Sequence, residues 1–255
     1  MTAALDFTPS PGAAPLPRMV LAQAGAEVRS VLRNGEQLLL TLIIPILVLV
    51  GFSAVPLLEV PGRRVDFVAP GVLALAIMST AFTGQAIGTG FERRYGVLKR
   101  LGATPLSRTG LMLAKTLAVI AVEVLQIAVI AAVALGMGWR PQGNPLWAAL
   151  LVLAGTAAFS GLALLMAGTL RAEATLAAAN LVYLVLLGLG GVVVPLTSFP
   201  HGLRTVVELL PITALTGGLR EVLAHGSGLP VRDLLVLLAW AALTLGLASR
   251  VFRWE

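Results

Sequence analysis

The sequence contains no cysteine, only two histidines and few charged residues for a chain of 255 residues. Without cysteine it can form no disulfide bond, no thiolate metal site and no cysteine nucleophile. Asp, Glu, Lys and Arg make up 12% of the residues, whereas apolar residue types make up 58%, and the mean hydropathy is +0.94. A soluble domain of this length needs a larger polar surface. The composition therefore predicts an integral membrane protein.

Motifs for enzymatic chemistry and for nucleotide binding are also missing. The sequence has no H-E-x-x-H, no G-x-S-x-G and no G-x-x-x-x-G-K-[ST] phosphate loop. Its two histidines, His201 and His225, fall in short segments predicted to lie outside the membrane. We therefore predict no catalytic residue and no metal site, which leaves an intramembrane enzyme without recognisable catalytic groups.

The charge that is present is mostly positive, with a net charge of +6 and an isoelectric point near 11. In a soluble protein this balance suggests nucleic-acid binding. In a membrane protein, basic residues gather in the cytoplasmic loops instead. We follow the second explanation and predict no nucleic-acid partner.

Long uncharged runs predict an all-α membrane protein with six transmembrane helices. A bilayer core of about 30 Å needs about 20 apolar residues in a helix, and these runs are too long and too uniformly apolar for barrel strands. We treat residues 38–255 as one six-span domain. The predicted spans are residues 38–58, 67–91, 111–139, 141–170, 174–200 and 234–249.

The basic residues also predict the orientation. With both termini in the cytoplasm, twelve of the 18 Lys and Arg residues lie inside and six lie outside. Because positive loops stay in the cytoplasm, we predict a multi-pass plasma-membrane protein with both termini inside.

Two segments fit neither a span nor a simple loop. Residues 1–18, which are rich in proline, precede them and are predicted to form a disordered tail. Residues 19–37 form an amphipathic pattern whose polar face includes Arg29 and Arg33, which predicts an interfacial helix on membrane lipid. Residues 198–228 predict a short helical hairpin in the outer leaflet, with Pro200 and Pro211 in first turns. Its polar ends are Arg204, Glu208, Arg220 and Glu221.

The stretch FERRYGVLKRLGATPLSRTG, residues 91–110, holds five of the 18 basic residues. At 100° per residue its first half forms a helix with one apolar and one charged face. Thr104 and Pro105 predict the N-cap and first turn of the following helix. The stretch is either a docking surface for a cytoplasmic partner or only a positive loop that fixes the orientation. The apolar face consists of Phe91, Tyr95, Leu98 and Leu101.

The segments ERRYGVLKRL, residues 92–101, and ATPLSR, residues 103–108, resemble the first cytoplasmic loop of ABC transporter type-2 permeases. That group includes the drug-resistance exporters of actinobacteria. The loop departs from the usual pattern at Val97, where threonine is common, and at Lys99, where glutamate is common. The resemblance extends to the amphipathic leader, the six spans and the prolines before the last span.

The resemblance implies a transport subunit that moves an amphiphilic drug, lipid or glycan out of the cytoplasm. Such a permease pairs with a second protomer, as a homodimer or heterodimer, and with two copies of an ATPase that binds ATP and Mg. An importer permease and a membrane scaffold protein are the alternatives. The resemblance assigns the coupling loop to Phe91, Glu92, Arg93, Arg94, Tyr95, Gly96, Val97, Leu98, Lys99, Arg100, Leu101, Thr104 and Pro105.

Four polar residues inside the spans are candidates for a substrate path. Glu123 is the only carboxylate well inside a predicted span, and a charge at that depth usually faces a partner or a wet cavity. Gln126 lies three residues further on, on the same helix face. Gln85 and Asn180 complete the set. The alternative role for all four is hydrogen bonding between helices.

Overall fold

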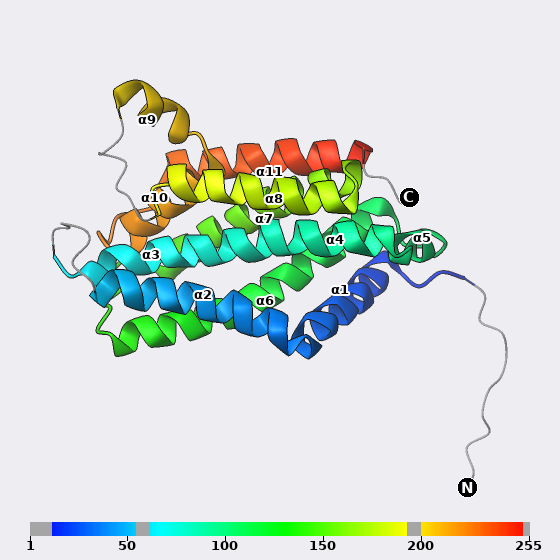
Figure 1. Ribbon diagram of the computed structural model, residues 1–255, viewed down its shortest axis with the longest axis horizontal. Coiled ribbons are helices and arrows are strands. Elements are labelled where there is room, and N and C mark those ends of the chain that lie inside the picture. Colours follow the sequence, from blue (N-terminus) through cyan, green and yellow to red (C-terminus); the bar gives the residue numbers. More distant parts are fainter. Residues whose placement is uncertain (1–11, 55–61, 193–199, 252–255) are drawn as a thin grey trace, which may run out of the picture.

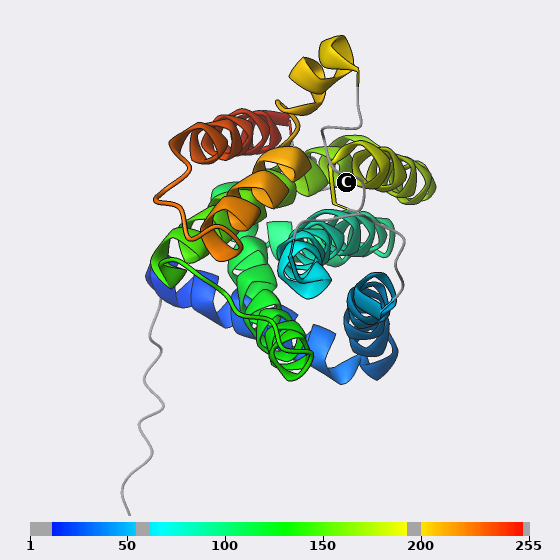
Figure 2. The ribbon, with the colours of Figure 1, turned by 90° about the vertical axis from the view of Figure 1, so that its left-hand side faces the viewer.

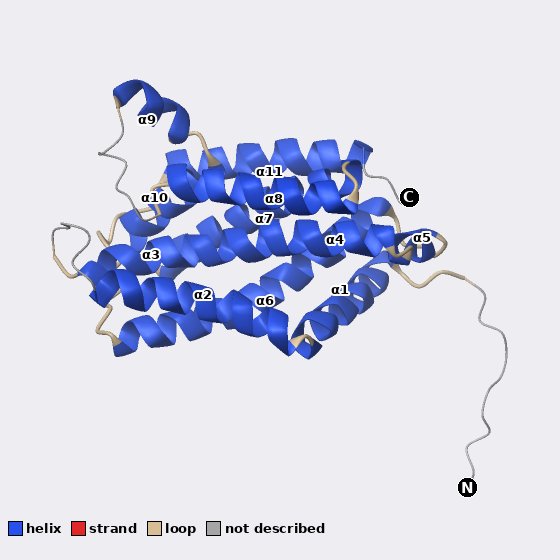
Figure 3. Cartoon of the chain, viewed as in Figure 1, coloured by secondary structure: helices blue, strands red, loops and turns tan. Residues whose placement is uncertain are grey.

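The computed structural model describes residues 12–54, 62–192 and 200–251, and every regular element in these ranges is a helix (Figure 3). This confirms the all-α prediction. Figure 1 labels the helices along the chain. They are α1 (Leu16–Arg33), α2 (Gly35–Ala54), α3 (Arg64–Ile77), the π-helical η1 (Met78–Gly84), α4 (Gln85–Arg94), α5 (Val97–Gly102), α6 (Arg108–Gly136), α7 (Pro145–Thr169), α8 (Ala172–Leu189), α9 (His201–Val207), α10 (Pro211–Leu223) and α11 (Val231–Val251).

Five helices are long and apolar enough to cross a membrane: α3–η1–α4 as one continuous helix, α6, α7, α8 and α11. The apolar part of α2, Thr41–Ala54, is shorter. The chain is therefore a multi-pass membrane protein, and the count of six spans stays a prediction. The predicted runs and the observed helices agree to within a few residues at most ends.

The continuous helix from α3 to α4 runs through the middle of the bundle (Figure 2). Of its most apolar 18-residue segment, about 83% is buried inside the protein, against 22% for the corresponding segments of α8 and α11. Small residues permit this central position, because backbones can approach one another closely there. A Cβ added to Gly71 would lie only 2.8 Å from the carbonyl oxygen of Val192.

Helix α1 differs from the predicted interfacial helix at both ends. It begins at Leu16, so residues 16–18 of the predicted tail are helical, while residues 1–11 lie outside the described ranges. It ends at Arg33, because Asn34 leaves helical geometry with φ −90° and ψ 80°. Residues 36 and 37 belong to α2 instead. Arg29 and Arg33 are exposed, as a polar face requires.

Helix α1 also has more than one apolar face. Val20 and Ala24 are buried in an apolar cluster with residues of α5 and α6, whereas Leu21 is 64% exposed and Leu32 is 47% exposed. One stripe therefore packs on the bundle, and the exposed leucines remain for lipid.

The predicted pair of short helices before the last span is present as α9 and α10, and its place in the outer leaflet stays a prediction. Helix α9 stands apart from the bundle in Figure 1, but ten of the 13 residues of α10 are buried, and α10 packs on α3, α7 and α11. The reason is that α10 has apolar residues on more than one side, including Ile212, Ala214 and Leu215. Such a helix is stable only when it is surrounded.

Arg220 on α10 is half-buried and has its own set of partners. Its guanidinium donates to the backbone carbonyl oxygens of Gly191, at 2.6 Å, and Val192, at 2.7 Å. It also lies 3.8 Å from the ring centroid of Phe67. Arg220 therefore joins α10 to the segment after α8 and to α3.

Candidate functional site

The loop predicted to couple to a partner lies at the end of the bundle where α1 and the described C-terminal part of α11 also lie (Figure 1). Helix α4 ends at Arg94, and Gly96 takes a left-handed conformation with φ +70° before α5 begins. Glycine adopts this conformation without steric cost. The turn at Gly96 separates the loop into the last turn of a span and a helix of six residues.

The predicted apolar docking stripe is therefore divided, and the prediction that it forms one surface is wrong. Leu98 is 0% exposed and packs with Val20 of α1 and Leu111 of α6. Tyr95 is 67% exposed and Val97 is 36% exposed. The helical spacing of 100° per residue does not continue through a left-handed glycine, so residues before and after Gly96 lose their common face. Leu98 anchors α5, and Tyr95 and Val97 remain accessible.

Two basic residues of the loop contact other residues of the same chain. Arg93 donates to the backbone oxygens of Ala167, at 2.9 Å, and Leu170, which closes the C-terminal end of α7. Arg94 forms an ion pair with Glu173 at the start of α8, and both side chains are more than half exposed. An exposed pair of this kind contributes little, about 0–1 kcal/mol. The exposed basic residues of α5 itself are Lys99 and Arg100.

The cap of the following helix is Ser107 and not Thr104 as predicted. The Ser107 hydroxyl accepts a hydrogen bond from the backbone N–H of Gly110 at 3.0 Å. The Thr104 hydroxyl donates to the carbonyl oxygen of Leu101 at 2.6 Å and so closes α5. Thr104 and Pro105 lie in the turn between the two helices.

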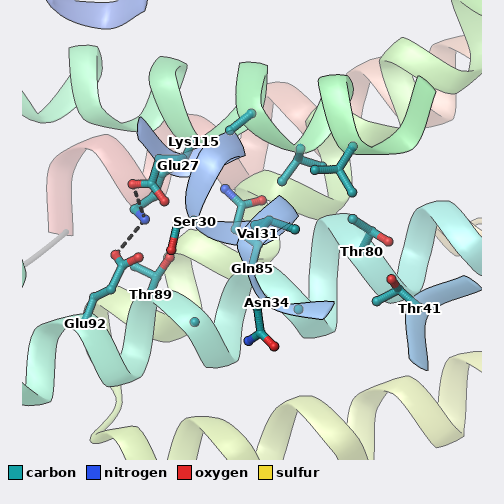
Figure 4. A pocket seen from close by; sticks show the side chains of 15 residues that line it. Glu27, Ser30, Val31, Asn34, Thr41, Thr80, Gln85, Thr89, Glu92 and Lys115 are labelled. Carbon is teal, nitrogen blue, oxygen red and sulfur yellow. Dashed lines mark hydrogen bonds and ion pairs between the residues drawn. The ribbon is translucent and has the colours of Figure 1, made fainter. Parts of the chain in front are cut away.

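A buried ion cluster lies behind this loop and joins three helices (Figure 4). The ammonium of Lys115 on α6 is 2.9 Å from a carboxylate oxygen of Glu27 on α1 and 2.6 Å from one of Glu92 on α4. Lys115 is 4% exposed. A buried ammonium is strongly destabilising unless it is paired and hydrogen-bonded. Glu92 therefore has a partner within its own chain. This cluster was not predicted from the sequence, and the lysine inside an apolar run is the signal that could have indicated it.

The cluster forms one end of a pocket of about 260 Å³. Three helices each contribute residues at spacing i, i+3, i+4 and i+7, which places them on one face of each helix. In Figure 4 the charged residues lie at one end, Thr41 and Thr80 at the other, and Gln85 between them. The lining residues are Glu27, Ser30 and Val31 of α1 with Asn34 directly after it, Gln85, Gly88, Thr89 and Glu92 of α4, Lys115, Ala118, Val119 and Val122 of α6, with Thr41, Thr80 and Gly84.

Gln85 is the one predicted path residue that lines this pocket. It is 8% exposed, and within the described part of the chain neither its amide nitrogen nor its amide oxygen has a hydrogen-bond partner. A buried amide without partners is unfavourable. Gln85 directly follows the π-helical segment η1, and π-helical turns are frequent at functional sites.

The other three candidates lie elsewhere. Glu123 is 1% exposed and accepts a hydrogen bond of 2.5 Å from Thr156 of α7. Gln126 donates to the backbone oxygen of Thr41 at 2.7 Å and accepts from a hydroxyl of η1 at 3.0 Å. Asn180 is exposed on α8 and donates within its own helix. Glu123 and Gln126 thus contact different neighbours and hydrogen-bond between helices, outside the lining of the pocket.

The described residues hold no group of three or more His, Asp or Glu that could bind a metal ion. The helices, the charged loop and the polar pocket define a multi-pass helical membrane protein with a polar site inside the bundle. The family model of the ABC-2 type transporters matches residues 20–224, about four fifths of the chain. The chain belongs to this family and is the membrane-spanning permease subunit of an ABC transporter. A search of curated proteins found no match.

Proposed function

We propose that the chain is the permease of an exporter driven by a separate cytoplasmic ATPase, present in two copies. The observation that carries this proposal is the structure of the loop around Gly96, which exposes Tyr95 at the end of α4 and Val97 at the start of α5, while Leu98 of α5 is fully buried. An accessible face on a firmly anchored short helix is what a docking element needs. ATP and Mg belong to the partner, since this sequence has no phosphate loop.

The coupling would pass from α5 into the bundle through packed side chains. Leu98 belongs to an apolar cluster with residues of α1, α6, α7 and α11. Glu92, at the end of α4, shares Lys115 with Glu27 of α1. A displacement of α5 would therefore be transmitted through packed side chains to the helices that line the pocket, with no long flexible connection between them.

The resemblance of the loop to drug-resistance permeases supports export, because importer loops carry a different Glu-Ala-Ala pattern. We further propose that both termini lie in the cytoplasm, that α2 completes a set of six spans, and that the protein works as a dimer. The described ends of the chain lie at the same end of the bundle as α5 (Figure 1), which supports the first point. The apolar segments of α8 and α11 are mostly exposed in the single chain, so lipid or a second protomer can cover them.

The test is purification of the native complex followed by mass spectrometry, and then ATP-driven transport in proteoliposomes. We expect an ATPase to copurify, and cargo found with the complex to move away from the side that receives ATP. Copurification with cargo moving toward the ATP side would establish an importer. A complex without any ATPase would contradict the proposal and favour a membrane scaffold.

A further inference from the structure

We propose that the pocket between α1, α2, η1–α4 and α6 binds an organic cation that carries at least one N–H donor, an amine either free or in a lipid headgroup. Three independent features carry this inference: the charge of the pocket, the amide of Gln85 and the size of the space. The statement that this cation is the transported cargo rests on the proposed function, whereas its binding in this pocket does not depend on that function.

The charged end of the pocket has an excess of negative charge. It holds the carboxylates of Glu27 and Glu92 and a single ammonium, that of Lys115. The other lining residues carry no formal charge. Lys115 already contacts both carboxylates, so it cannot compensate both fully. A positively charged group is therefore attracted to this end, and an anion is repelled.

The amide of Gln85 requires a polar ligand. It is more than nine-tenths buried, lines the pocket and makes no hydrogen bond within the described part of the chain. An apolar occupant would leave the amide oxygen and nitrogen unpaired at a cost in affinity. A ligand with an N–H donor pairs the amide oxygen, and Figure 4 shows Gln85 near the charged residues.

The size of the pocket separates an organic cation from a metal ion. A volume of about 260 Å³ is many times the roughly 10–15 Å³ that one water molecule requires on this kind of measure. Apolar walls at Val31, Val119 and Val122 accompany the polar groups. They fit the carbon skeleton of an amine, and a hydrated inorganic ion gains nothing from them.

The experiment compares three probes with one carbon skeleton: 2-phenylethylammonium, 2-phenylethanol and phenylacetate. Binding to the purified full chain in neutral detergent is measured by ligand-detected NMR and by the thermal unfolding midpoint. We expect the ammonium probe to bind at least tenfold more tightly than either isostere. Added phosphatidylethanolamine identifies the source of the amine, since it displaces the probe if a lipid headgroup is the occupant and leaves it bound if a free amine is.

Two pocket variants and one control sharpen the test. Glu92→Gln removes the excess negative charge and should weaken binding of the ammonium probe at least fivefold. Gln85→Leu should weaken its binding at least tenfold. The same variant should raise the unfolding midpoint of the protein without probe, because an unpaired buried amide is removed. Asn180→Leu replaces an amide that lies outside the pocket and should change neither quantity. If Gln85→Leu does not fold, Gln85→Met takes its place.

Equal binding of the three probes would overturn the proposal. So would a Gln85→Leu variant that binds normally and unfolds at a lower temperature, since the amide would then have a structural partner. If the probe binds but no ATPase copurifies, the cation site is supported and the transport function is refuted. If the complex exports cargo with ATP but the probe does not bind, the transport function is supported and the cation site is refuted.

Discussion

The two ends of the bundle use their charges in opposite ways. At the end that holds α5, a buried lysine is shared by carboxylates from two other helices, 88 and 23 residues away in the chain. At the end that holds α9, Glu208 lies near the surface and pairs with Arg204 of the same helical turn and with Arg232. The first arrangement joins three helices around a buried ammonium, whereas the second joins the end of α9 to the first turn of α11 at the surface. Under the proposed function, the buried cluster is the one through which a movement of α5 would reach the pocket.

Removal of the shared lysine should have the largest effect. Lys115→Met leaves two partly buried carboxylates facing each other without their cation, and loss of one partner of a fully buried pair typically costs about 3–5 kcal/mol. We expect a clear fall in the unfolding midpoint of the purified protein. The matched control is the triple variant Lys115→Met, Glu27→Gln, Glu92→Gln, which removes all three charges and should regain most of the loss. A single variant as stable as the wild type would mean that the cluster does not join the helices.

Truncation of the α5 anchor should come next. Leu98 is fully buried, so Leu98→Ala should destabilise the fold by about 2–5 kcal/mol through lost packing and a residual cavity. Substrate-stimulated ATP hydrolysis should become uncoupled, because α5 loses its hold on α1 and α6. Val97→Ala on the exposed side is the control and should change the unfolding midpoint little. Equal effects of the two variants would refute the division of the stripe at Gly96.

A smaller effect is expected from Arg220 at the opposite end. Arg220→Met removes the donors to the carbonyl oxygens of Gly191 and Val192. Because Arg220 is only half-buried, water can replace it, and the loss should stay near the lower end of the usual range, about 1 kcal/mol for each carbonyl. The unfolding midpoint should fall, while ATPase binding to the complex should stay intact. A loss of the ATPase with Arg220→Met would show that the two ends are not separate in function.

The surface pairs of Glu208 should give the smallest effect, with a defined pH dependence. Hydrogen bonds from Arg204 and Arg232 lower the pKa of Glu208 in the folded protein. The stabilisation is therefore present above the unfolded carboxyl pKa of about 4.3 and disappears as the pH falls through the folded value. Glu208→Gln should reduce the unfolding midpoint slightly at pH 7, and this difference should shrink as the pH falls below the unfolded carboxyl pKa. A larger loss at pH 3 would contradict the assignment.

The sequence predicted the long helices well because an uncharged apolar run of bilayer length is enough, by itself, to indicate a transmembrane helix. Local patterns failed where a single residue changes the backbone direction. Gly96 breaks the helical spacing, so Leu98 could not be placed from residues before it, and Ser107 competes with Thr104 for the cap because both have the same side-chain chemistry. Asn34 likewise ends α1 earlier than its amphipathic pattern does.

Contacts between distant segments were beyond the reach of the sequence for a different reason. Glu27 and Lys115 meet only after α1 folds back on α6, and Arg220 finds its carbonyl partners only because α10 enters the bundle. No spacing rule relates residues so far apart in one sequence. Gln85 was predicted as a path residue, and its place in the pocket depends on the faces of three helices together.

We propose that the exposed side chains on either side of Gly96, Tyr95 and Val97, dock the ATPase, while the buried Leu98 of α5 transmits movement. The most direct measurement is copurification of the ATPase with Tyr95→Ala, since Tyr95 is 67% exposed and should change the stability of the permease little. We expect at least a tenfold loss of bound ATPase, with the permease still inserted, and a much smaller loss when Lys99 and Arg100 are replaced by glutamine. Full retention of the ATPase by Tyr95→Ala, together with its release by the two glutamines, would contradict the account and leave α5 as a loop that acts by charge alone.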